Sequence, residues 1–261
     1  MKIILSPRKS VFENAADYFD LSKKLRAKAE GARKAIVDTH AKLEALRNAP
    51  VEVPKERLKI AVKKEWFEKF RWFTTSGGLL VLAGRDAKQN ELLVARQLED
   101  ADLFFHADVH GAPATILKKG TVASEQDKLE AAAFAAAYSS AWKGGGGAAD
   151  VYAVRKEQVS KYSHGEYVAK GGFVISGQRE WFKNTALLLI VAEENGRAVV
   201  FPGNFGKKIE KKLVITPGSC EKKQAAENIK KQLNIINTLD EVIQLLPAGG
   251  SSEFLKTSNR R

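Results

Sequence analysis

A proline-free stretch from Val11 to about Asn48 narrows the possible folds of this chain more than any other part of its sequence. It contains a single glycine, Gly31. Apolar side chains recur in it at spacings of three, four or seven, which predicts a helix with a narrow apolar stripe, as in a coiled-coil seam. At 1.5 Å per residue such a helix is roughly 55 Å long. The stripe consists of Tyr18, Leu21, Leu25, Ala29, Ala32, Ile36, Leu43 and Leu46.

The segment after this helix predicts a turn and a return arm. Pro50 and Pro54 cannot continue a helix. Residues 55–73 then restart a helical pattern, with Leu58, Val62, Trp66 and Phe70 on one face. We therefore expect an antiparallel helical hairpin in residues 1–63, a globular domain in residues 64–220, and C-terminal helices with a basic polar tail in residues 221–261.

The globular part predicts an α+β fold in which helices pack on one mixed sheet. Asp86 and Ser124 are suited to cap helices that run to Leu98 and Trp142. Two further helices are expected over 222–233 and 239–246, and the glycines of residues 144–147 predict a loop. Strands are expected over 79–83, 103–106, 114–117, 151–154, 173–176, 187–192, 198–201 and 213–215.

Positive charge is concentrated at the two ends of the chain. The formal net charge is +12, with +8 in residues 1–73, −1 in residues 74–206 and +5 in residues 207–261. Basic segments of this kind favour an extended polyanion as partner, although a solvated helix face gives the same pattern. No apolar run reaches the roughly 18 residues of a membrane span. The one cysteine, Cys220, fits a reducing compartment, so a cytoplasmic location is expected.

Three segments carry residues suited to RNA. Residues 66–73 hold five aromatic side chains beside Lys69 and Arg71, and mixed basic and aromatic residues can stack on bases and bind phosphates. Packing of the rings into the domain is the alternative. The sequence GRDAKQNE (84–91) places Arg85 at a helix N-terminus, a natural anion site. Residues 154–177 add Lys156, Lys161 and Lys170 among several glycines.

The sequence HADVHG (106–111) is the most enzyme-like part of the chain. On a strand, His106, Asp108 and His110 would point to one face. Such a row can ligate a metal, contact nucleic acid or form structural hydrogen bonds. No second cluster supplies further ligands, so neither a metal nor another cofactor is expected.

The combination of WFEKFRWF, GRDAKQNE, HADVHGAP, QVSK, GEY and GGFVISG, in this order over residues 64–183, resembles the NFACT-R domain. The preceding basic helical segment is similar to the coiled-coil middle domain of NFACT proteins. The resemblance implies RNA binding and association with the large ribosomal subunit, with tRNA as a further candidate, in ribosome-associated quality control of stalled nascent chains. It does not carry over tail synthesis, because this chain shows no counterpart of the family's N-terminal domain. The candidate nucleic-acid-binding residues are Lys69, Arg71, Trp72, Arg85, Asp86, Lys88, Gln89, Asn90, His106, Asp108, His110, Lys156, Lys161 and Lys170.

Two alternatives to an RNA-binding module without catalytic activity stay open. One is a metal-assisted hydrolase of nucleic acid or of a tRNA ester that uses His106, Asp108 and His110. The other is an adaptor whose apolar stripe binds a helix of another protein.

Overall fold

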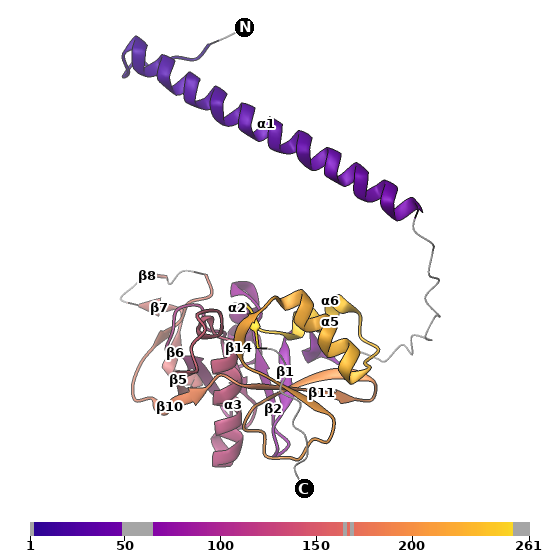
Figure 1. Cartoon of the computed structure of the whole chain (residues 1–261). Helices are drawn as coiled ribbons and strands as arrows, with labels where there is room; N and C mark the ends of the chain where they lie inside the picture. Colours follow the sequence, from indigo (N-terminus) through magenta and orange to yellow (C-terminus); the bar gives the residue numbers. More distant parts are fainter. Residues whose placement is uncertain (1–2, 49–64, 164–165, 168–169, 253–261) are drawn as a thin grey trace. The chain divides into compact units, whose positions relative to one another are not determined.

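The computed structural model describes residues 3–48, 65–163, 166–167 and 170–252 (Figure 1). The chain divides into two compact units, Met1–Lys59 and Ile60–Arg261, which are described separately. No helix among the described residues is long and apolar enough to cross a membrane.

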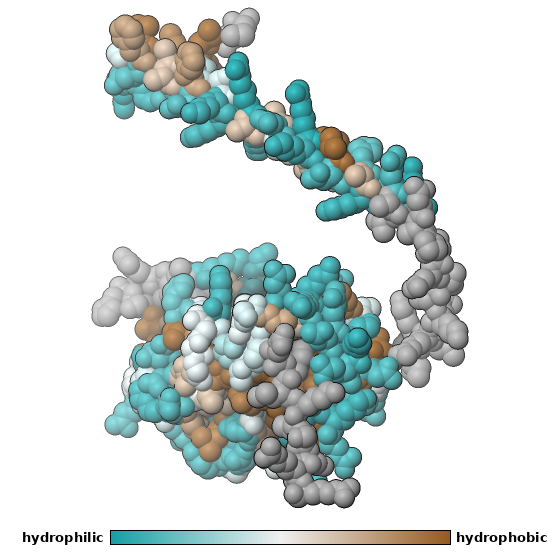
Figure 2. Space-filling view, viewed as in Figure 1, coloured by the Kyte–Doolittle hydropathy of each residue, from teal (hydrophilic) through white to brown (hydrophobic). Residues whose placement is uncertain are grey.

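Among its described residues, the first unit contains one long helix, α1 (Val11–Asn48), which confirms the long helix predicted over these residues. The preceding residues fold back on its first turn, where the Asn14 side chain accepts a hydrogen bond from Ser6 N at 2.8 Å and donates to Ser6 O at 3.2 Å. The apolar stripe is open to solvent, with Leu21 49% and Leu25 56% exposed. Figure 2 shows apolar side chains among hydrophilic ones along α1.

The predicted return arm is wrong in its last part. Residues 49–64 lie outside the described residues, and the chain then forms a short 3₁₀ helix, η1 (Trp66–Lys69), and a strand, β1 (Arg71–Thr74). Within β1, Trp72 packs on one side of the sheet and Phe73 on the other. Both faces of β1 are therefore apolar, and a short run of this kind cannot be distinguished from a helix by its periodicity.

The second unit is built on a six-stranded sheet in the order β1-β2-β4-β3-β5-β10. Its strands after β1 are β2 (Leu80–Ala83), β3 (Leu103–Ala107), β4 (Thr115–Leu117), β5 (Ala148–Arg155) and β10 (Glu180–Ala186). The predicted α+β class, with helices packed on the sheet, is confirmed, and all the described ladders of this sheet are antiparallel.

Helices cover both faces of the large sheet. Helix α3 (Glu125–Ala137) contacts β3, β4, β5 and β10, and its alanines allow close packing. Helix α2 (Ala87–Gln97) lies against the opposite face, where Leu93 joins Phe104 and Ile116 in a second apolar cluster. The predicted caps are confirmed, since Asp86 accepts from Gln89 N and Ser124 from Asp127 N. The helix expected to reach Trp142 ends at Ala137, and Ser139 caps a separate short helix, α4 (Ser140–Lys143).

The second unit also contains a three-stranded sheet in the order β12-β11-β13, whereas a single sheet was expected. This second sheet consists of β11 (Leu189–Glu194), β12 (Arg197–Pro202) and β13 (Lys212–Ile215), and it is covered by α5 (Lys222–Leu233) and α6 (Leu239–Leu245). The short elements are η2 (Gly120–Val122), η3 (Lys156–Gln158), β6 (Val159–Ser160), β7 (Tyr162–Ser163), β8 (Glu166–Tyr167), β9 (Val174–Ile175) and β14 (Pro217–Cys220).

Candidate nucleic-acid interface

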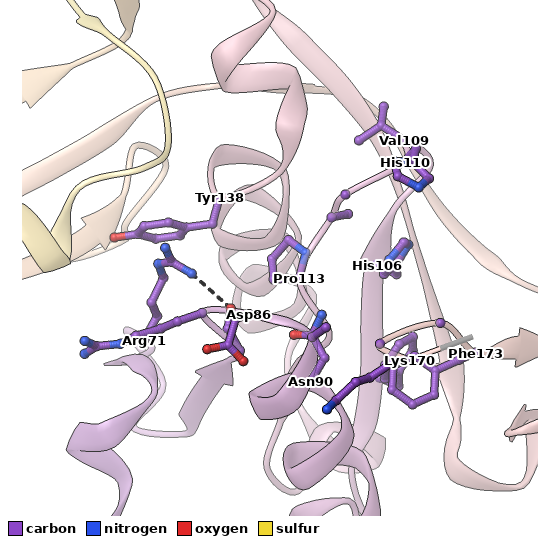
Figure 3. Close-up of a pocket in the computed structure, with 18 of the residues that line it drawn as sticks. Arg71, Asp86, Asn90, His106, Val109, His110, Pro113, Tyr138, Lys170 and Phe173 are labelled. Atoms are coloured by element: carbon purple, nitrogen blue, oxygen red, sulfur yellow. Dashed lines mark hydrogen bonds between the residues drawn. The ribbon is translucent and has the colours of Figure 1, made fainter. Parts of the chain in front are cut away.

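A cavity of about 540 Å³ opens beside the N-terminus of α2. Figure 3 shows Arg71 and Tyr138 on one side of it and His106, Lys170 and Phe173 on the other. The cavity brings together seven of the predicted residues from elements far apart in the sequence: Arg71, Arg85, Asp86, Asn90, His106, His110 and Lys170. Its size is within the usual range for a small-ligand site.

The turn between β2 and α2 forms one wall of this cavity. Asp86 caps α2, while the buried Asn90 side chain accepts a hydrogen bond from Ala114 N at 3.2 Å. A Cβ atom at Gly84 would overlap the Asn90 side chain, so the turn requires glycine. Asp86 and Asn90 therefore fix the backbone of the site, and the helix dipole of α2 adds positive potential at the cavity.

Two arginines lie on this wall, and the Asp86 carboxylate is near enough to Arg71 to raise the pKa of its guanidinium, against the larger effect of burial. Arg71 Nη1 donates to Gly84 O at 3.0 Å, and its guanidinium lies 4.6 Å from the centre of the Tyr138 ring. Arg85 donates to Gln244 Oε1 and to the carbonyl oxygens of Glu68 and Phe70. Among the described residues neither forms an ion pair, and the buried Nε of each has no hydrogen-bond partner.

A third cation, Lys222 at the start of α5, shares the electrostatic environment of these arginines. Burial lowers the pKa of its ammonium group, and the positive charges of Arg71 and Arg85 lower it further. Burial likewise lowers the pKa of both guanidinium groups. Three like charges held close together are costly in a fold, and groups with pKa values perturbed in this way cluster at functional sites. The arrangement is suited to a bound anion.

The predicted His-Asp-His row on one strand face is wrong. Strand β3 ends at Ala107, so Asp108 and His110 lie in the following turn. The main-chain carbonyl of His110 accepts a hydrogen bond from Ser140 Oγ. Burial is the main cause of the lowered pKa of His106 and favours its neutral imidazole. The described residues contain no group of three or more His, Cys, Asp or Glu that could hold a metal ion.

The other predicted residues lie outside this cavity. Lys69 and Trp72 line a neighbouring hollow that also reaches Arg85. Gln89 holds two segments together, because Nε2 donates to Lys69 O while Oε1 accepts from Arg85 N. Lys88 is exposed on α2. Lys156 forms an ion pair with Asp100, and Lys161 forms one with Glu91.

Four residues at the site were not among the predicted ones: Tyr138, Tyr152, Arg179 and Lys222. Tyr138 and Tyr152 line the cavity, and Arg179 lines an adjoining hollow with His106 and Asp108. Burial raises the pKa of Tyr138, whose hydroxyl donates to Leu245 O at 2.6 Å. Lys222 opens a basic helix, which is the only local signal in the sequence for any of the four.

Cations around a cavity, with aromatic rings beside them, are typical of proteins that bind nucleic acids. Residues 69–177 match the NFACT protein RNA-binding domain. This segment includes β1 to β5, α2, α3 and all seven predicted residues that line the cavity. The chain belongs to the NFACT family, as the sequence motifs predicted.

The relatives are considerably longer than this chain. It is 38% identical over 200 residues to the archaeal Rqc2 homolog aRqcH of Methanocaldococcus jannaschii, covering 74% of this chain and 30% of that protein. It is 35% identical over 188 residues to the Drosophila melanogaster ribosome quality control complex subunit NEMF homolog, covering 69% of this chain and 18% of that protein. It is 33% identical over 185 residues to the human ribosome quality control complex subunit NEMF, covering 68% of this chain and 17% of that protein. The chain thus spans less than a third of the length of these relatives.

Proposed function

We propose that this chain is an RNA-binding module that associates with the large ribosomal subunit in cytosolic quality control of stalled nascent chains. The observation that carries the proposal is the group of cations Arg71 and Arg85, which line the cavity, and Lys222 beside them, in a domain matched to RNA binding; none of the three forms an ion pair among the described residues. Phosphates of RNA would supply the missing negative charge. The ribosomal setting is supported by the names of the Drosophila and human relatives, which are subunits of the ribosome quality control complex.

Co-sedimentation with isolated large and small ribosomal subunits tests this proposal. We expect the full chain to stay on large subunits at near-physiological salt, and to be released as salt rises further, because phosphate contacts release counterions. An Arg71→Gln variant should be retained less well, and an Arg96→Gln variant, which loses an exposed arginine outside the cavity, should behave as the parent chain. Equal, salt-labile retention on both subunits would refute a specific large-subunit role. Binding of the full chain to free tRNA, measured over the same range of salt concentrations, tests whether tRNA is a second ligand.

We propose a binding role and not catalysis for His106, Asp108 and His110. Their separation between the end of β3 and the turn that follows supports this assignment. Metal analysis of the purified chain and an RNA- or aminoacyl-tRNA-cleavage assay, with His110→Ala as control, test it. Stoichiometric metal together with turnover that the substitution abolishes would establish the hydrolase instead.

We further propose that α1 binds a helix of another protein. Its support is the exposed apolar stripe of this helix, which includes Leu25, 56% exposed, and Ile36, 59% exposed, since such side chains are typical anchors for a partner helix. Removal of residues 1–50 should abolish a protein contact while RNA affinity is kept. Loss of RNA affinity without loss of a protein contact would count against this role.

A further inference from the structure

Three rings form a row across the large sheet, on the face that carries α2. Antiparallel pairing sets His106 of β3 opposite Tyr152 of β5, and Tyr152 opposite Trp181 of β10. Directly opposed residues point to the same face, so the rings are neighbours. Their centroids are 5.9 Å apart for His106 and Tyr152, and 5.5 Å apart for Tyr152 and Trp181.

Two cations lie over this row. The Arg179 guanidinium is 4.5 Å from the centre of the Tyr152 ring and 5.9 Å from that of Trp181. The Lys183 ammonium is 3.9 Å from the centre of the Trp181 ring and also pairs with Asp150 at 2.8 Å. Arg179 is exposed and, among the described residues, forms no ion pair. Its planar group can stack on a base and its charge can meet a phosphate.

The row leads from the cavity to the edge of the sheet. His106 and Tyr152 line the cavity, and both also line an adjoining hollow of about 290 Å³ that includes Arg179. Trp181 follows on β10, the edge strand, and is 39% exposed. Trp181 belongs to neither apolar cluster of the core, whereas the neighbouring Phe182 points to the opposite face and packs against Phe105.

We propose that the row His106–Tyr152–Trp181, with Arg179 and Lys183, binds unpaired bases of single-stranded RNA. The inference rests on the proposed RNA-binding function and names the form of RNA that the site takes. Bases in a duplex are stacked inside the helix and cannot reach the rings, whereas unpaired bases stack on aromatic side chains and guanidinium planes. One base stacks on the exposed Trp181 and the next on the Arg179 guanidinium, and the cavity beside His106 receives the continuing strand.

Binding of two labelled RNAs to the full chain tests the proposal. One probe is a short oligouridylate, and the other is a fully paired duplex with the same number of phosphates. We expect Trp181→Ala to weaken oligouridylate binding roughly 5- to 150-fold, the range for loss of one stacked base. Leu129→Ala, which removes an apolar side chain that is also 39% exposed but belongs to α3 on the other face of the sheet, should have no effect. Arg179→Gln should weaken oligouridylate binding and Arg96→Gln should not.

A second measurement does not depend on the stability of the alanine variant. Trp181→Phe keeps a ring, so it should retain most of the affinity for oligouridylate. Stacking of a base on the indole should quench tryptophan fluorescence of the parent chain, and Trp181→Phe should lose that quenching.

The outcomes separate this inference from the function on which it rests. Weaker oligouridylate binding in both Trp181→Ala and Arg179→Gln, with quenching that depends on Trp181, supports the row. If none of these substitutions alters RNA binding, the proposed base-binding role of the row is refuted, while the RNA-binding function stays in place. No binding of the parent chain to either probe overturns both.

Discussion

Lys170 provides a direct test of which cations contact RNA. Its side chain is exposed at the rim of the cavity, and no hydrogen bond or ion pair holds it among the described residues, so Lys170→Gln removes a charge without disturbing the fold. Lys88 is an equally exposed lysine on α2 that does not line the cavity. Lys88→Gln is therefore a matched control with the same loss of charge.

The magnitude follows from the cations around the site. Three line the cavity, Arg71, Arg85 and Lys170, while Lys222 and Arg179 lie beside it. If each contacts one phosphate of a single strand, the logarithm of the binding constant should fall with the logarithm of salt concentration with a slope of about −3.5. Lys170→Gln should reduce the slope to about −2.8 and weaken binding about fivefold at 0.1 M salt, since one contact contributes about 0.7 in the exponent.

The assay is a titration of labelled oligouridylate with protein at several salt concentrations, with circular dichroism as a check on folding. Lys88→Gln should keep the parent slope, and Lys170→Arg should restore it. Parallel lines for the parent chain and Lys170→Gln would refute the assignment of this cation to the interface. A smaller slope for Lys88→Gln than for Lys170→Gln would place the RNA on the outer surface of α2.

Three further substitutions test the framework of the site. Glu130 is fully buried and accepts hydrogen bonds from Ser76 N and Gly206 N. Because Glu130→Ala leaves these donors unsatisfied, it should lower the free energy of unfolding in urea by about 3 kcal/mol. Glu125 is exposed, so Glu125→Ala should lower it little, and equal losses of stability would contradict the role of Glu130. Gly171→Ala, with φ of +83° and a new Cβ 2.7 Å from Ala87 Cβ, should weaken RNA binding, whereas Gly145→Ala, with φ of +73° and open space, should cost only about 1 kcal/mol of stability and leave binding unchanged. Because burial lowers the pKa of His106, the unfolded state takes up protons first, and stability should fall as pH drops below about 6.5. His106→Gln should reduce that loss in thermal unfolding followed against pH, and an unchanged pH dependence would refute it.

The parts of the fold that sequence analysis predicted are those set by local interactions. The long helix α1, the Asp86 and Ser124 caps and most core strands follow from periodicity and from side chains a few residues away. Strand β10 was not predicted, because its sequence EWFKNTA has only one buried residue, Phe182, and carries no run of apolar residues. The second sheet depends on pairing between β11 and β13, which no local pattern specifies.

The candidate site was only partly predictable for the same reason. Arg85, Asp86 and Asn90 come from one strand-to-helix turn, so a local reading finds them. Arg179 directly precedes β10, and Lys222 is the first residue of α5, so both are distant in sequence from the strand-to-helix turn. Only the tertiary fold shows that they lie close to the site. The spacing of His106, Asp108 and His110 gave a wrong geometry because the strand ends at Ala107, three residues before His110.

The irregularity in β10 has a consequence for self-association. Its register with β5 shifts between Phe182 and Thr185, where Asn184 adopts a φ of +51°. A bulge of this kind, next to the charged Lys183, interrupts the row of free main-chain groups that another strand would need for pairing. The edge that exposes Trp181 is thus a poor template for adding a strand from a second copy. The domain can display an apolar ring at its border and still resist edge-to-edge aggregation.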